Sequence, residues 1–298
     1  MIPNMKFYVI SIVAIFAALG IGIYIGFALD TGSFVVEQRE DIVQKLEERF
    51  DYLRGENQNL KLELKELELE NENCKIYMDS TYEELVKNRL SGAKIGIIET
   101  VDDYMYSGVG QILEAAGATV VNVVTINENI MEEDALLKIY EELNIDIENL
   151  NLISNTSKEL SKGIINGENS DLIKKLEENR IIDIVGLLDE PVDYLVIAGG
   201  SVKENPERLS LVDKIIIDTA KSMEKEIVGI EKSNINYSYI DTYKSYKIST
   251  IDNIDMIMGK VSLVLALEGR PGHYGIKPTA EDILPNLKLS LVEYPKER

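Results

Sequence analysis

The stretch VQKLEERFDYLRGENQNLKLELKEL, residues 43–67, is the most regular part of the sequence and decides how the rest of the chain is organised. It lies inside a heptad pattern over residues 36–85 that has Val36 at position a. Position d then holds four leucines in succession: Leu46, Leu53, Leu60 and Leu67. An apolar seam with a period of 3.5 residues is typical of a two-stranded coiled coil. The sequence therefore predicts a coiled-coil helix over residues 36–88.

Polar residues in this seam bear on the number and direction of the helices. Asn57 and Asn71 fall on position a, where an asparagine is best satisfied by its twin across a parallel dimer. Cys74, the sole cysteine, falls on d; we expect a buried thiol, the alternative being an interchain disulfide in an oxidising compartment. A single helix that folds back onto its own domain is the alternative to a parallel homodimer. The predicted dimer contacts in the coil are Leu46, Leu53, Asn57, Leu60, Leu64, Leu67, Asn71 and Cys74.

An uncharged segment precedes the coil. Residues 7–29 follow a short flank, residues 1–6, and are long enough to cross a hydrocarbon core of about 30 Å as one helix. They exceed the apolar region of a signal peptide, about 7–15 residues, so we expect an uncleaved anchor. Small residues recur every four positions and end in Gly22 and Gly26, a pattern that lets two membrane helices approach closely. These two glycines are therefore further predicted dimer contacts.

Charge limits the partners and favours one orientation. The formal net charge of −21 argues against nucleic acid, whose phosphates need a basic face, and against anionic lipid headgroups. No basic cluster directly follows Leu29, which favours an extracytoplasmic domain on a single-pass protein of the cell membrane. Residues 30–34, DTGSF, are expected to break the helix between span and coil.

The remaining residues, 93–298, alternate between apolar runs and helical patterns. We expect strands over residues 93–98, 119–124, 192–198 and 226–230, with a short strand near 246–249. We expect helices over residues 109–116, 132–179 (interrupted near 151 and at 163–169), 206–223, 235–243 and 253–267. This alternation predicts an α/β domain, Rossmann-like, with three layers and a mostly parallel sheet.

Ligands of open parallel sheets bind beyond the carboxyl ends of the strands. The sequence places Glu99, Asp102, Asp103, Ser201 and Glu231 near that rim. No nucleophile elbow and no ordered Ser/Asp partner accompanies Arg270, His273 and Tyr274, which could otherwise serve as anion binder, base and acid, so we expect a protein that is not an enzyme.

Three segments that contain glycines bear on ligand binding. Residues 107–110 offer a GxG before a helix, but Leu113 replaces the third glycine of a dinucleotide fingerprint, so we expect no bound nucleotide. Gly199 and Gly200 are expected to form a strand-to-helix turn that needs a positive φ. The loop at residues 269–275, GRPGHYG, is expected to be an ordered surface turn or a partner-docking loop, the alternative being an acid–base site.

Soft metal ligands are few. Copper(I) prefers thiolate, thioether and imidazole groups, and the candidates beside Cys74 are His273, Met256 and Met258. The two methionines are too close in sequence to share a helix face, and methionine is more often a core residue. The residues by themselves predict no cofactor.

The order of features resembles the MctB family, described as copper transport outer membrane proteins. The resemblance rests on the span (ALGIGIYIG, residues 18–26), on residues 93–99 and 192–200, and on LEGRPGHYG (267–275) followed by DILP (282–285). It implies a role in copper transport or homeostasis at the cell envelope, with the α/β domain outside the membrane. Part of the family is similar to an envelope protein that works with a membrane partner in cell-wall remodelling and division. A scaffold that binds a protein partner without metal is therefore the alternative.

Overall fold

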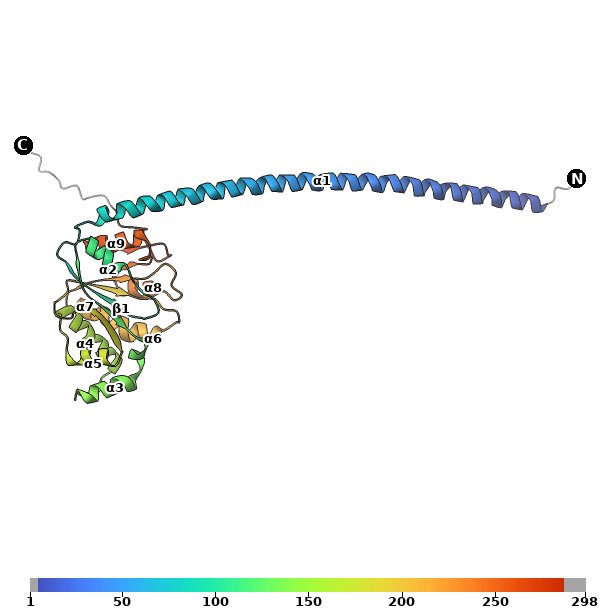
Figure 1. Cartoon of the computed structure of the whole chain (residues 1–298). Helices are drawn as coiled ribbons and strands as arrows, with labels where there is room; N and C mark the ends of the chain where they lie inside the picture. The colour runs from blue at the N-terminus through green and yellow to red at the C-terminus, as the bar shows by residue number, and fades with distance from the viewer. Residues whose placement is uncertain (1–4, 287–298) are drawn as a thin grey trace, which may run out of the picture. The chain divides into compact units, whose positions relative to one another are not determined.

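The computed structural model describes the backbone of residues 5–286 and the side chains of residues 5–29 and 42–286. The chain divides into two compact units, Met1–Lys75 and Ile76–Arg298. The first is helical, and the second contains an α/β fold (Figure 1).

One helix, α1 (Met5–Val86), runs for 82 residues from the apolar segment through the heptads (Figure 1). The break expected at residues 30–34 is wrong, because this segment is helical. A single glycine costs a helix interior only about 1 kcal/mol, and helix formation is cooperative once nucleated. The helices on both sides therefore extend through a segment that lacks proline.

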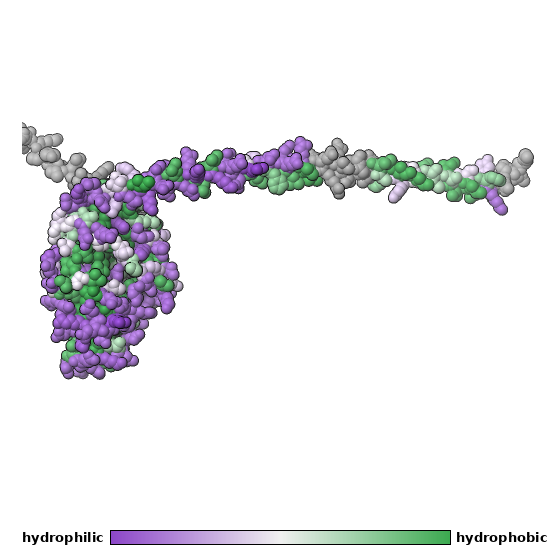
Figure 2. Space-filling model, in the orientation of Figure 1, coloured by the Kyte–Doolittle hydropathy of each residue, from purple (hydrophilic) through white to green (hydrophobic). Residues whose placement is uncertain are grey.

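The first unit has two parts of opposite polarity. Met5–Leu29 is long and apolar enough to cross a membrane, the one such helix among the described residues. Residues 42–75 are mostly hydrophilic (Figure 2). Their seam leucines are exposed, Leu46 by 50% and Leu60 by 58%, and Cys74 is exposed as well. The isolated helix thus leaves its apolar seam uncovered, and the predicted dimer remains a prediction.

The second unit is built on a seven-stranded sheet in the order β3-β2-β1-β4-β5-β6-β7. All neighbours pair in parallel except β2 and β3. The strands are β1 (Lys94–Glu99), β2 (Thr119–Ile126), β3 (Ile182–Gly186), β4 (Tyr194–Ala198), β5 (Glu226–Ile230), β6 (Ser249–Ile251) and β7 (His273–Tyr274). The α/β class and the parallel β1-α2-β2 unit are confirmed.

The two edge strands were not predicted. The sequence of β3, IDIVG, mixes polar and apolar residues and lies at a sheet edge, so it lacks the apolar run of a central strand. The two residues of β7 fall inside the glycine-rich loop 269–275, which was expected to be a turn. Because His273 and Tyr274 pair with β6, the second half of this loop is part of the sheet.

The helices follow the predicted order with shifted ends. They are α2 (Val109–Ala115), η1 (Glu128–Met131), α3 (Glu133–Glu142), α4 (Leu152–Asn166), α5 (Asp171–Glu178), α6 (Pro206–Arg208), the π-helical η2 (Leu209–Asp213), α7 (Lys214–Ser222), α8 (Ile240–Ser245) and α9 (Ile257–Leu267). The interruption near residue 151 is confirmed, since the Asn151 side chain caps α4. The expected helix start at residue 235 is wrong: Tyr237 forms a bridge with Ser201, and α8 begins later.

Helices cover both faces of the sheet. Alternate residues of a strand point to opposite faces, so Ile97 and Ile98 enter different cores. One core contains residues of α3, α4, α5, α7 and α8, and the other contains α2, α9 and the last turn of α1. Val86 of that turn is fully buried, so α1 ends inside the α/β core.

Candidate functional site

The reversal of strand order places a cleft between the carboxyl ends of β1 and β4. From β1 the chain proceeds to β2 on one side, and β4 lies on the other, so the following loops diverge there. A cleft of about 210 Å³ lies at this point. Asp102, Asp103 and Ser201, all predicted from the sequence, line it together with Arg208 and Tyr239.

The loops around this switch-point cleft are tied together by hydrogen bonds. The Val202 amide donates to Oδ2 of Asp103 over 2.8 Å, joining the loops after β1 and β4. Ser201 exchanges two backbone bonds with Tyr237, and its hydroxyl donates to the Lys203 carbonyl. The Ser201 hydroxyl therefore stabilises its own loop.

The other two predicted rim residues lie outside the cleft lining. Glu99 accepts from the Thr125 hydroxyl over 2.7 Å and from the Tyr106 amide over 3.3 Å. Glu231 is fully buried, pairs with Lys277, and accepts from the Ser238 hydroxyl. Burial raises the pKa of Glu231, while the Lys277 ammonium opposes that rise. Both carboxylates stabilise loops at the carboxyl ends of the strands.

A buried polar cluster lies behind the cleft and was not predicted. It consists of Thr100, Arg208, Asp213 and Tyr243. Oδ1 of Asp213 accepts from the Thr100 hydroxyl over 2.9 Å and from the Tyr243 hydroxyl. The Arg208 guanidinium donates to the carbonyls of Thr100 and Ile126. These bonds fix the chain segments that leave β1 and β2.

The sequence contains one signal of this cluster. Asp213 occupies the apolar stripe of the helix over residues 206–223, where an acid is not expected. The other members of the stripe are Leu209, Val212, Ile216, Ile217 and Ala220. Asp213 is also the last residue of the π-helical η2, and such segments are frequent at functional sites. Arg208, by contrast, has the sequence context of a surface residue.

The two glycines after β4 are needed for different reasons. Gly200 has a φ of +93°, which confirms the expected positive-φ turn at this position. Gly199 has an ordinary φ, but a β-carbon there would collide with the rings of Tyr243 and Tyr239. Gly199 therefore allows the loop to approach the buried cluster.

The metal candidates belong to different elements of the structure. His273 lies in β7, where Nδ1 is 2.9 Å from the Thr250 hydroxyl oxygen, and burial followed by the Lys244 charge lowers the pKa of the imidazole. Met256 precedes α9, and Met258 lies in its first turn. Cys74 belongs to the other compact unit. Within the described residues, no three His, Cys, Asp or Glu side chains are grouped as a metal site.

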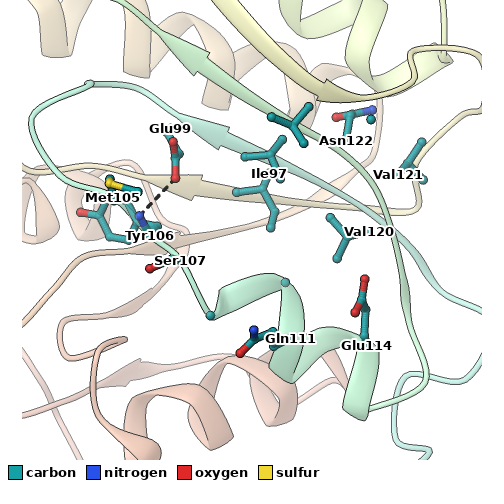
Figure 3. A pocket seen from close by; sticks show the side chains of 15 residues that line it. Ile97, Glu99, Met105, Tyr106, Ser107, Gln111, Glu114, Val120, Val121 and Asn122 are labelled. Carbon is teal, nitrogen blue, oxygen red and sulfur yellow. Dashed lines mark hydrogen bonds between the residues drawn. The ribbon is translucent and has the colours of Figure 1, made fainter.

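A second hollow is apolar and lies beside α2 (Figure 3). This trough has a volume of about 570 Å³, and β1, β2, β3 and α2 contribute to its lining. Ile97, Val120 and Val121 project from the strands, while Gln111 and Glu114 project from α2 (Figure 3). The strand residues on one side of the trough are apolar, and the α2 residues Gln111 and Glu114 on the other side are polar. Small-molecule sites combine mostly apolar linings with a few polar groups in this way.

Exposed apolar residues continue along the trough. Val185 of β3 is 69% exposed and lies opposite Val123 of β2, so both project to the same side of the sheet. Met105, which also lines the trough, is 75% exposed. These two side chains are the most exposed apolar residues of the trough.

Comparison with known proteins identifies the family. No curated protein matches the chain. A protein-family model described as "Copper transport outer membrane protein, MctB" matches residues 1–285, which include the apolar helix, the heptads, the whole sheet and the loop at residues 269–275. Because this match spans nearly the entire 298-residue sequence, the chain belongs to the MctB family.

Proposed function

We propose that this chain is a membrane-anchored, single-pass envelope protein that takes part in copper transport or homeostasis. The family match over residues 1–285 carries this proposal. The apolar helix Met5–Leu29 supports the anchoring. In this proposal the α/β unit lies outside the cytoplasmic membrane, and the exposed leucine seam of α1 is covered by a second copy in a parallel homodimer.

The proposed role is non-enzymatic, and copper is the cargo of the system. Within the described residues of one chain, no three His, Cys, Asp or Glu side chains are grouped as a metal site, and the Thr250 hydroxyl engages Nδ1 of His273. Copper would therefore be handled together with a partner or a second copy.

A test in cells addresses the copper role. Cells that lack the chain are expected to differ at least twofold from wild type in cell-associated copper, measured by mass spectrometry during growth in added copper. The full chain should restore the wild-type value, and a chain without residues 1–29 should not. Unchanged copper content in the deleted cells would contradict the proposal.

Copper(I) titration of the purified full chain tests the absence of a site in one protomer. We expect wild type and the triple variant His273→Gln, Met256→Leu, Met258→Leu to take up copper(I) equally weakly, because the Thr250 hydroxyl engages Nδ1 of His273 and the two methionines are too close in sequence to share a helix face. Light scattering on the same samples gives the oligomeric state. Tight, stoichiometric uptake that the triple variant loses would instead identify these three residues as ligands.

A second candidate function is a scaffold that binds a partner protein, such as a membrane protein in cell-wall remodelling or division. The exposed apolar trough beside α2 favours it. A scaffold would leave cellular copper unchanged and would lose its function when the coil or the trough is altered.

A further inference from the structure

Arg208, which lines the switch-point cleft, carries a buried charge without an ion-pair partner. The residue is only 3% exposed. Among the described residues, no carboxylate forms an ion pair with its guanidinium. Asp213 lies near enough for the two charges to interact, but its Oδ1 accepts from hydroxyls instead. Buried charges in proteins are normally paired, so Arg208 offers an uncompensated cation to the cleft.

The guanidinium of Arg208 also keeps a free donor. An arginine has five N–H groups. The groups on Nε and Nη2 donate to the carbonyls of Thr100 and Ile126. Nη1 makes a single contact, with the Asn127 carbonyl oxygen at 3.4 Å. One N–H of Nη1 therefore has no acceptor within the part of the chain that the structure describes.

Tyr239 supplies a second unused donor in the same cleft. The residue is 1% exposed and lines the cleft, and its hydroxyl oxygen is buried without a hydrogen-bond partner among the described residues. The neighbouring Ser201 hydroxyl donates to the Lys203 carbonyl. The Tyr239 ring is held by other contacts, because it packs edge-on against Tyr243 with 6.2 Å between the ring centroids. An unpaired buried hydroxyl destabilises a fold, so its presence here points to a ligand.

The mouth of the cleft has the opposite charge. Its exposed ionisable side chains are four acids and one base: Asp102, Asp103, Glu128, Glu204 and Lys203. A phosphate or a dicarboxylate would be repelled by the excess of acids, whereas an ammonium group would be attracted. The buried floor, formed by Arg208 and Tyr239, instead suits one carboxylate, the group that arginine binds best. The two ends together select a zwitterion.

The size of the cleft narrows the choice further. Its volume of about 210 Å³ lies below the roughly 300–1,000 Å³ of sites for drug-sized molecules. A nucleotide or an oligosaccharide would therefore be too large. A free α-amino acid is small enough, and it carries one carboxylate and one ammonium group on the same carbon.

We propose that the switch-point cleft binds a free α-amino acid. The carboxylate accepts from Nη1 of Arg208 and from the Tyr239 hydroxyl, and the ammonium group lies among the acids of the mouth. This position, beyond the carboxyl ends of β1 and β4, is where open parallel sheets bind their ligands. The inference is independent of both functions proposed above.

The test is isothermal titration calorimetry of the full chain in phosphatidylcholine nanodiscs, with each of the twenty standard amino acids in turn. At least one should bind saturably, with one molecule per chain. The tightest is then compared with its amide, which lacks the carboxylate, and with its deaminated acid, which lacks the ammonium group. Each analogue should bind at least tenfold more weakly.

Tyr239→Phe locates the binding, because it removes only the hydroxyl. That oxygen has no partner in the fold, so the urea midpoint should not fall while the amino acid binds at least tenfold more weakly. Tyr237→Phe is the matched control. Tyr237 is 44% exposed and does not belong to the cleft lining, so its variant should bind like wild type.

A double variant, Asp102→Asn with Asp103→Asn, tests the mouth. The Asp103→Asn side chain keeps an oxygen that can accept from the Val202 amide, so the loop contact is retained while the charge is lost. The variant should bind the amino acid more weakly and should lose most of the preference over the deaminated acid. An unchanged preference would contradict the assignment of the ammonium group to these acids.

Three further results would overturn the proposal. The first is saturable binding by none of the amino acids, and the second is equal binding of the amino acid and its amide. The third concerns Tyr239→Phe. Binding equal to wild type would place the ligand outside this cleft, and a urea midpoint below that of Tyr237→Phe would assign the hydroxyl to the stability of the fold.

Discussion

Replacing Leu60 by aspartate is expected to dissociate the proposed dimer while the α/β unit stays folded. Burial of a leucine side chain contributes about 1.5–3 kcal/mol, and the dimer loses two such side chains. The dissociation constant of the dimer should therefore rise by roughly 100-fold or more. Two aspartates facing each other across the seam add repulsion. Diamide oxidation of membranes provides the measurement, because Cys74 lies on the same seam and should cross-link in wild type and not in the variant.

Leu62 is the matched control. It is 66% exposed in the single helix, close to the 58% of Leu60, but it falls on the outer position f of the heptad. Leu62→Asp should therefore cross-link like wild type, and light scattering of the purified chain should give the same dimer mass. Equal loss of cross-linking in both variants would show that the heptad register is wrong.

Replacing Asp213 by alanine is expected to destabilise the α/β unit by about 2 kcal/mol. The side chain is fully buried and accepts from the hydroxyls of Thr100 and Tyr243. Its removal takes this acceptor from the Tyr243 hydroxyl and leaves the Thr100 hydroxyl with its longer bond to the Ala198 carbonyl. Each unpaired buried group costs roughly 1–3 kcal/mol. Urea unfolding followed by circular dichroism measures the change. The exposed Asp218 on α7 pairs with Lys214 in a surface ion pair, and Asp218→Ala should cost less than about 1 kcal/mol.

The same carboxyl predicts a pH dependence. Burial raises the pKa of Asp213 to about 6, although the bonds from Tyr243 and Thr100 and the charge of Arg208 oppose this. The folded state then holds this proton more tightly than the unfolded state, whose carboxyl has a pKa near 3.8. The stability that this group contributes therefore falls as pH rises from about 4 to about 6, by at most about 1.4 kcal/mol per pH unit.

Asp213→Asn isolates this effect. Its amide oxygen can still accept from the two hydroxyls, and it does not titrate. The difference in unfolding free energy between wild type and Asp213→Asn should change across pH 4–6 and stay constant above pH 7. A constant difference over the whole range would contradict the assigned titration.

Local sequence patterns were sufficient for most of the elements. The heptads, the apolar residues 7–29 and the runs that became β1, β2, β4 and β5 each combine one periodicity with clear end signals. Because the predicted strands alternate with helices, the sequence also implied a mostly parallel sheet. The predicted end of β5, Ile230, agrees with the structure. These features depend on contacts between neighbours in sequence, which the sequence displays directly.

The edge strands β3 and β7 and the continuity of α1 could not be predicted from the local sequence pattern. The mixed sequence of β3 becomes a strand because β2 offers an unpaired edge, and β7 forms because β6 does. Residues 30–34 are helical because both flanks are helical. In each case the conformation is set by neighbours that a short window does not contain.

The candidate site shows the same division. The sequence by itself determined the chemistry at the carboxyl rim, and Asp102, Asp103 and Ser201 do line one cleft. Only the tertiary structure brought Thr100, Asp213 and Tyr243 together, since these residues are separated by up to 143 positions along the chain. Only the tertiary structure left Val185 uncovered beside α2, because exposure depends on which helices cover a strand and no strand sequence records that.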